Sequence, residues 1–172
     1  AGIARTFQNI RVFPRMTVME NVVVAARQVE ANLADAEAAA MRELVRMGLD
    51  RFADRPAAGL AYGLRRRLEV ARALALKPRY LLLDEPAAGM NAVETAELVS
   101  ILAVVRAERR IGIILIEHDM RLVMNLCERI VVMDRGRVIA DGTPSEVQKN
   151  PDVIAAYRGS RTARARTENQ TA

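Results

Sequence analysis

Two short apolar runs, at residues 80–83 and 111–116, predict strands of a sheet that is buried on both faces. Residues 91–110 lie between them and repeat apolar side chains at helical spacing. Asn91 and Glu94 are placed to form a capping box at the start of this helix. The order strand, helix, strand predicts parallel pairing, so the expected fold class is α/β.

The flanking regions predict further helices and one hairpin. Residues 19–49 and 64–76 have helical apolar spacing, and the segment between them, which contains Pro56, reads as a connection. Further along, the apolar stretches 129–133 and 137–140 flank Asp134-Arg135-Gly136, which predicts a β-hairpin. Thr143 and the proline after it open a last helix that we expect to end near Gly159.

Length and composition place the chain among ordinary globular proteins. It has 172 residues, of which 51% are hydrophobic and 27% charged, enough for one domain of ordinary size. No apolar run approaches the ~18 residues of a membrane span, and the first residues lack the pattern of a secretory signal. A single cysteine, Cys127, permits no internal disulfide and no multi-cysteine metal site. We therefore expect a cytoplasmic protein.

Charge gives little sign of nucleic-acid binding. The 26 basic and 21 acidic residues leave a formal charge of +5, and most of this excess lies in residues 158–172. Three tyrosines, three phenylalanines and no tryptophan offer few stacking platforms. We expect no nucleic-acid partner.

Residues with side chains suited to catalysis follow the ends of the two predicted strands. Asp84 and Glu85 follow the first strand, and His118 follows the second, so parallel strands would bring all three to one edge of the sheet. There Asp84 could hold Mg²⁺, and Glu85 could accept a proton from an attacking water. Asp84 and Glu85 could equally be a turn pair before Pro86.

Two further polar residues have a functional and a structural interpretation. His118, the only histidine, could donate to a phosphate oxygen or to the attacking water, although a lone histidine is more often structural. Gln8 offers an amide oxygen to a Mg²⁺-bound water, although an isolated glutamine is usually a surface residue.

Four segments, in this order, resemble the nucleotide-binding subunit of ABC transporters. They are Leu60-Ala61-Tyr62-Gly63 with the helix at 66–74, Leu81-Leu82-Leu83-Asp84-Glu85-Pro86, Ala88-Gly89-Met90-Asn91, and Ile116-Glu117-His118-Asp119. Residues 2–9, 117–124 and 150–157 resemble in particular the branch that serves branched-chain amino acid importers. The resemblance covers residues 1 to about 159.

The resemblance implies a partial P-loop NTPase (RecA-like) fold, with a parallel sheet, helices on both faces and a helical insertion subdomain. Residues 1–19 would form the Q-loop segment of the core, and 20–76 the helical subdomain that ends in the signature helix. Residues 77–159 would form the catalytic core, and 160–172 a disordered basic tail.

The resemblance also implies ATP hydrolysis with Mg²⁺ between two such subunits, identical or related, that pack head to tail. Transport would require an integral membrane permease, which would place this subunit peripherally on the inner face of the plasma membrane. By the resemblance, Gln8 would be the Q-loop glutamine and contact Mg²⁺, and Asp84 would be the Walker B magnesium ligand. Glu85 would be the general base and His118 the switch histidine. Ala61, Tyr62 and Gly63 would form the signature segment that acts on the partner's nucleotide, and Asn91 would belong to the D-loop.

The chain departs from the family pattern in two places. Ala61 and Leu64 remove a polar contact from the signature segment, whereas its backbone donors remain. A phosphate-binding loop needs Gly-x-x-x-x-Gly-Lys-Ser/Thr, and neither Lys77 nor Lys149 follows a glycine. In the family this loop precedes the Q-loop, so the sequence resembles an amino-terminally truncated ABC domain.

Two expectations follow from the absence of this loop. The isolated chain should bind Mg-ATP weakly or not at all, and saturable binding at low micromolar concentration in calorimetry would contradict this. The strands that end at Leu83 and Ile116 should present apolar edges, because their neighbours would lie upstream. The chain should then be less soluble than a version extended upstream.

The leading functional interpretation is an ATPase subunit of an importer for branched-chain or related amino acids. One alternative is a noncatalytic ABC-like fragment or docking module that cannot bind ATP in cis. A second alternative is a soluble ABC ATPase of DNA repair or translation, which DNA-stimulated hydrolysis would support.

Overall fold

The computed structural model describes residues 2–157, which form two compact units divided after Leu122. The first unit holds a parallel sheet and a helical subdomain. The second holds a hairpin and short helices. Each unit is described by itself.

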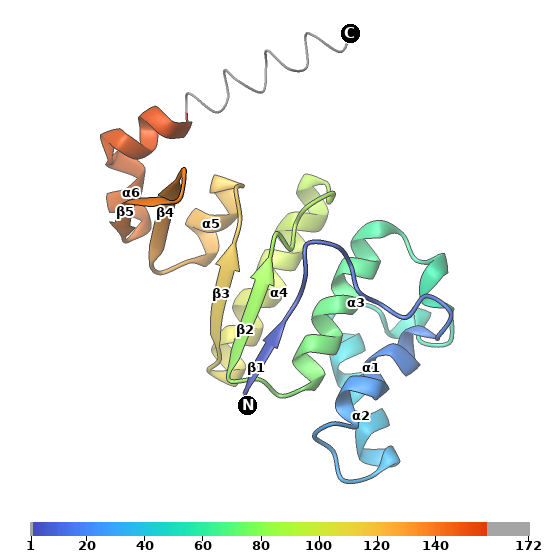
Figure 1. The fold of residues 1–172 in the computed structure, drawn as a ribbon. Coiled ribbons are helices and arrows are strands. Elements are labelled where there is room, and N and C mark those ends of the chain that lie inside the picture. Colours follow the sequence, from blue (N-terminus) through green and yellow to red (C-terminus); the bar gives the residue numbers. More distant parts are fainter. Residues whose placement is uncertain (1, 158–172) are drawn as a thin grey trace, which may run out of the picture. The chain divides into compact units, whose positions relative to one another are not determined.

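The sheet of the first unit has three parallel strands, β1 (Ile3–Arg5), β2 (Tyr80–Asp84) and β3 (Gly112–Ile116), in the order β1-β2-β3 (Figure 1). This confirms the α/β class. Strand β1 was not expected, because three residues are too few to show a pattern. It pairs along one edge of β2 while β3 pairs along the other. The expectation of an open edge at Leu83 is therefore wrong, since β2 is the central strand.

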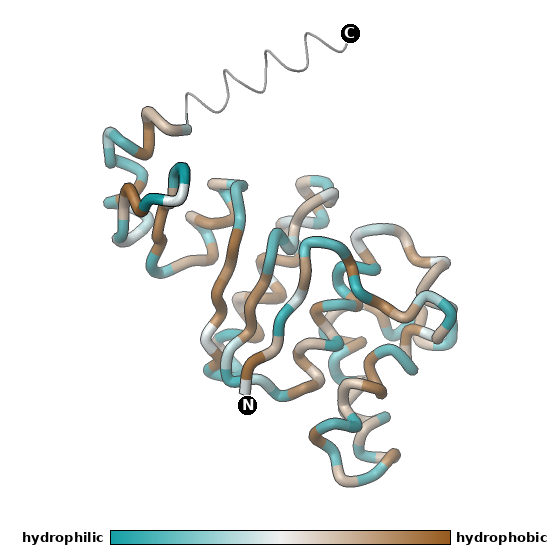
Figure 2. Tube along the Cα trace, viewed as in Figure 1, coloured by the Kyte–Doolittle hydropathy of each residue, from teal (hydrophilic) through white to brown (hydrophobic). Residues whose placement is uncertain are grey.

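The two faces of the sheet differ in exposure. Ala4, Leu81 and Leu83 point to one face and are at most 4% exposed, with α4 (Ala92–Arg109) behind them in Figure 1. On the opposite face Ile3, Ile114 and Ile116 are more than half exposed, and Tyr80 is 49% exposed. Figure 2 shows β2 and β3 as apolar stretches between hydrophilic turns. Within the first unit α4 thus lies on one face, whereas the other face, for which we also expected helices, has exposed apolar side chains.

The helical subdomain consists of α1 (Val18–Ala26), α2 (Leu33–Arg46) and α3 (Tyr62–Ala75), joined by 3-10 turns at Asp50–Phe52 and Ala57–Gly59. The single helical stretch expected at 19–49 is divided, because Asn32 caps the start of α2 by accepting the Asp35 N–H. Its core consists of fully buried side chains from all three helices and the turn after α2: Val18, Val22, Leu44, Met47, Leu68 and Leu74.

Helix α4 begins with the capping box that the sequence predicts. The Asn91 side chain accepts the Glu94 N–H at 3.0 Å, and the Glu94 carboxylate accepts the Asn91 N–H at 2.9 Å. The helix ends where Arg110 adopts a left-handed conformation with φ of 50°.

The second unit contains the predicted hairpin, β4 (Ile130–Asp134) paired antiparallel with β5 (Arg137–Gly142). Helix α5 (Met120–Leu126) spans the division between the units, and α6 (Pro144–Lys149) follows the hairpin. The last helix is shorter than expected. Asn150 is extended because Pro151 disfavours a helical residue before it, and a separate helical stretch follows at 151–157.

Residues 160–172, for which we expect a disordered tail, lie outside the described part of the chain. Among the described residues, no helix has the length and apolar content that crossing a membrane requires.

Candidate functional site

Glu85 stands at the carboxyl end of β2 in a left-handed conformation with φ of 45°. Such a conformation is uncommon outside glycine and costs about 1 kcal/mol or more. It is held by the Glu85 N–H, which donates to the Ile116 carbonyl at the end of β3 at 2.9 Å. The bend therefore directs the Glu85 side chain to the edge where both strands end.

Three of the candidate residues meet at this edge. Glu85 Oε1 lies 3.6 Å from Nδ1 of His118, and Glu85 Oε2 accepts a hydrogen bond from Nε2 of Gln8 at 3.2 Å. The Glu85 and His118 side chains are 28% and 55% exposed, so water reaches both. A carboxylate between an amide and an imidazole, open to solvent, has the arrangement of a general base with two orienting neighbours.

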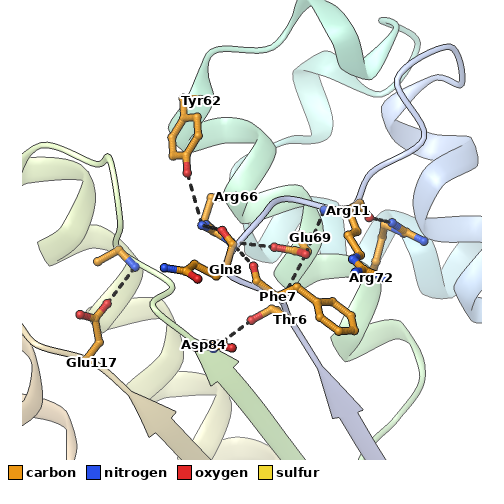
Figure 3. Close-up of polar contacts among 11 residues, drawn as sticks. Thr6, Phe7, Gln8, Arg11, Tyr62, Arg66, Glu69, Arg72, Asp84 and Glu117 are labelled. Carbon is orange, nitrogen blue, oxygen red and sulfur yellow. Dashed lines mark hydrogen bonds and ion pairs between the residues drawn. The ribbon is translucent and has the colours of Figure 1, made fainter. Parts of the chain in front are cut away.

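Asp84 precedes Glu85 and forms an ion pair with Arg5 of β1. Asp84 Oδ2 accepts from Arg5 Nη2 at 3.0 Å. The Asp84 backbone N–H donates to the buried Thr6 hydroxyl at 3.4 Å, as Figure 3 shows. The described residues contain no cluster of three or more His, Cys, Asp or Glu side chains suited to a metal ion. Mg²⁺ does not need such a cluster, because one or two carboxylates plus substrate phosphates commonly hold it. The oxygens of Asp84 and Gln8 fit that requirement.

Glu117 supports the site and was missed from sequence. Its side chain is 2% exposed, and it accepts the Ala87 N–H at 3.2 Å and the His118 N–H at 3.0 Å. It thereby ties the loop after β2 to the loop after β3 (Figure 3). The available signal was an acidic residue placed directly between an apolar run and a histidine.

Ala61, Tyr62 and Gly63, the expected signature segment, lie at the amino end of α3. Ala61 is the N-cap residue and makes no side-chain cap hydrogen bond, so the first turn keeps amide donors without a side-chain acceptor. The Tyr62 ring lies against Gly89, where a Cβ atom would come within 2.8 Å of Tyr62 Cε1. Gly63 similarly faces the Glu94 carboxylate. The contacts of residues 2–157 thus join this segment to the loop that contains Asn91, whose side chain caps α4.

An arginine and phenylalanine cluster lines a pocket of about 530 Å³ beside α3. The guanidinium of Arg11 stacks 4.2 Å from the Phe7 ring centre, and that of Arg72 lies 4.6 Å from the Phe13 ring centre. Phe13 is 43% exposed and is therefore not a core residue. Burial lowers the pKa of the Arg72 guanidinium, and the charge of Glu69 opposes this shift.

Comparisons with known proteins identify the family to which this architecture and site belong. The family model of the ABC transporter matches residues 1–88, and that of the branched-chain amino acid ATP-binding cassette transporter matches residues 137–157. The chain belongs to the ABC transporter ATP-binding family.

The chain is similar to BraF of Pseudomonas aeruginosa and LivG of Escherichia coli, both high-affinity branched-chain amino acid transport ATP-binding proteins. The identities are 44% and 46%, over 92% of this chain and 68% of each relative. Among solved structures, cbiO1 of Clostridium perfringens, part of the ABC transporter complex cbiONQ, matches at 30% identity with a TM-score of 0.79. That match covers 90% of this chain and 62% of cbiO1.

Proposed function

We propose that this chain carries the catalytic edge of an ATP-hydrolysing subunit that energises an importer of branched-chain or related amino acids. The observation that supports hydrolysis most directly is the position of Glu85 between Gln8 and His118, next to Asp84. The substrate class rests on the similarity to BraF and LivG, since no residue of this chain is expected to contact the transported molecule.

Each residue of this edge has a proposed task. Glu85 accepts the proton of the attacking water, and His118 holds that water or a phosphate oxygen in line. Asp84 and Gln8 would hold Mg²⁺, which neutralises charge on phosphate oxygens when it is bound. Until then Arg5 orients the Asp84 carboxylate by donating a hydrogen bond to it.

The amino end of α3 is proposed to act on the nucleotide of a second ATPase subunit, identical or related. The first-turn amides at Ala61, Tyr62 and Gly63 and the positive end of the helix dipole suit the terminal phosphate of ATP. Asn91 contributes by fixing the neighbouring loop. Ala61 and Leu64 leave this contact to the backbone alone.

The pocket lined by Phe7, Arg11, Phe13 and Arg72 is the proposed contact with an integral membrane permease. An exposed aromatic ring flanked by arginines supports this, because such residues are enriched at protein interfaces. The subunit would then act peripherally on the inner face of the plasma membrane.

The hydrolytic role is tested in a hybrid in which this chain replaces the matching region of BraF. We expect the hybrid to hydrolyse Mg-ATP and Glu85→Gln to lower kcat by about 10²- to 10⁴-fold with nucleotide binding retained. Hydrolysis by the Glu85→Gln hybrid at the unsubstituted rate would overturn the assignment of the base.

The permease contact is tested by coexpressing the chain with the membrane subunits of a branched-chain amino acid importer. We expect membrane fractions to retain the chain only when the permease is present, and Phe13→Glu to abolish this retention. Leu33→Glu is the control, because Leu33 is 55% exposed in the same subdomain but lies outside the pocket. Equal retention of both variants would refute this contact surface.

A further inference from the structure

One face of α3 carries three polar side chains, two of which bind the segment around Gln8. Tyr62, Arg66 and Glu69 follow one another at helical spacing and therefore lie on the same side of the helix. The Arg66 side chain is fully buried, and that of Glu69 is 5% exposed. The two form an ion pair at 3.0 Å (Figure 3).

The pair binds the main chain of residues 7–11, with Arg66 as donor and Glu69 as acceptor. Arg66 donates from Nη1 to the Phe7 carbonyl and from Nη2 to the Gln8 carbonyl, each at 2.7 Å. Glu69 Oε1 accepts the Phe7 N–H at 3.3 Å and the Arg11 N–H at 3.1 Å. Main-chain donors and acceptors of one short segment thus bind both buried charges, and of the Arg66 nitrogens only Nε is left without a hydrogen-bond partner.

A chain of contacts consequently runs from the signature segment to the catalytic edge. Arg66 Nη2 also donates to the Tyr62 hydroxyl at 3.3 Å, in the first turn of α3. Gln8, whose carbonyl Arg66 holds, donates through its side chain to Glu85. Arg66 therefore contacts both the first turn of α3 and Gln8.

Net stability alone does not account for this arrangement. A buried ion pair rarely stabilises a protein more than apolar residues of the same volume, because both charges lose their hydration. The planar guanidinium instead fixes the position of the main chain, because its two Nη groups donate to two neighbouring carbonyl groups at once.

We propose that Arg66 is a positioning residue that holds the main chain of residues 7–11 and thereby keeps the Gln8 side chain on Glu85. It links the amino end of α3, where a partner's nucleotide would bind, to the base of its own subunit. The importance of this link for ATP hydrolysis rests on the proposed function, whereas its effect on Gln8 and Glu85 does not.

The test uses the untagged full chain and two nuclear magnetic resonance readouts. His118 is the only histidine, so its imidazole signal is unambiguous and reports on Glu85, 3.6 Å away. Amide exchange at Phe7 and Arg11 reports on the held segment. The decisive variant is the double substitution Arg66→Met with Glu69→Gln, which leaves no unpaired buried charge and keeps an amide oxygen for the two N–H groups.

In the double variant we expect exchange at Phe7 and Arg11 to rise about tenfold or more, because their acceptor loses its charge and the two Arg66 bonds that hold this segment are lost. The His118 imidazole signal should move, because Gln8 no longer stays on Glu85. Arg66→Lys should preserve the fold, but its amide exchange and its His118 signal should still differ from those of the unsubstituted chain. One ammonium group does not reproduce the two parallel donors of the guanidinium. Arg67→Met is the matched control, because the neighbouring Arg67 pairs with Glu97 instead.

A merely structural Arg66 would give a different result. Exchange would then rise across the helical subdomain in proportion to lost stability, and the His118 signal would match that of the unsubstituted chain. That outcome, or equal behaviour of the double variant and Arg67→Met, would overturn the proposal. Neither readout requires ATP or a permease, so failure here is distinguishable from failure of the proposed function.

Discussion

Gly63 has no side chain, and this leaves room for the Glu94 carboxylate of the capping box at the start of α4. A Cβ atom there would lie 2.8 Å from Glu94 Oε1, so Gly63→Ala must displace the carboxylate that accepts the Asn91 N–H. We expect amide exchange at Asn91 to increase, whereas the free energy of unfolding changes by less than about 1 kcal/mol because alanine favours the helix. In Gly59→Ala, where a Cβ meets nothing within 4 Å, Asn91 should stay protected. Unchanged exchange in Gly63→Ala would contradict the steric argument.

Asn21 is a fully buried polar residue that holds the segment before α1. Its side chain accepts the Phe13 N–H at 2.8 Å and donates to the carbonyls of Phe13 and Thr17, both at 2.9 Å. In Asn21→Ala the Phe13 N–H loses its acceptor and the two carbonyls each lose a side-chain donor, which should lower the free energy of unfolding by about 2–3 kcal/mol in urea titrations. The comparison is Asn32→Ala at an exposed helix cap, which should cost about 1 kcal/mol. A smaller loss for Asn21→Ala than for Asn32→Ala would contradict this account.

At the scale of elements, the β4–β5 hairpin should respond to acid. The Arg129 guanidinium donates to Asp141 at 2.7 and 2.8 Å, and this hydrogen bond lowers the pKa of the Asp141 carboxyl. The folded pKa lies below the unfolded one. The stabilisation is therefore present above the ordinary carboxyl pKa, near 4, and is lost as the pH falls through the lowered value.

We expect the amide signals of the hairpin to indicate progressive opening below about pH 4. Asp141→Asn should remove this part of the pH dependence, and Asp152→Asn, outside the hairpin, should leave it. Glu146 adds a similar response at the start of α6, because the Thr143 N–H donates to its carboxylate and lowers its pKa. A hairpin with the same acid response in Asp141→Asn would show that another group controls it.

At the scale of the whole molecule, the uncovered face of the sheet should govern self-association. Ile114 and Ile116 are 54% and 59% exposed on neighbouring positions of one face. Replacing both with threonine keeps the preference for strand structure while removing apolar surface. We expect less self-association in sedimentation velocity and an unchanged circular dichroism spectrum. Val104→Thr, on the exposed side of α4, should not alter association, and equal behaviour of the two variants would contradict a role for this face.

The sequence by itself determined the features that depend on neighbouring residues along the chain. Two apolar runs and the helix between them predict parallel strands, and parallel strands bring Glu85 and His118 to one edge. The Asn91 capping box and the β4–β5 turn also follow from local residue types. These predictions succeed because hydrogen bonds and side-chain periodicity within a few residues specify them.

Only the tertiary structure decided the features whose partners lie far along the chain. Strand β1 exists because Ala4 pairs with Leu81, and three residues carry no periodic signal of their own. Arg66 is one of three consecutive arginines, and only the packing of α3 against residues 7–11 shows that it is the buried one. The exposure of one sheet face could not be predicted from the sequence either. An apolar run indicates a preference for burial, but it does not indicate whether other elements cover the strand.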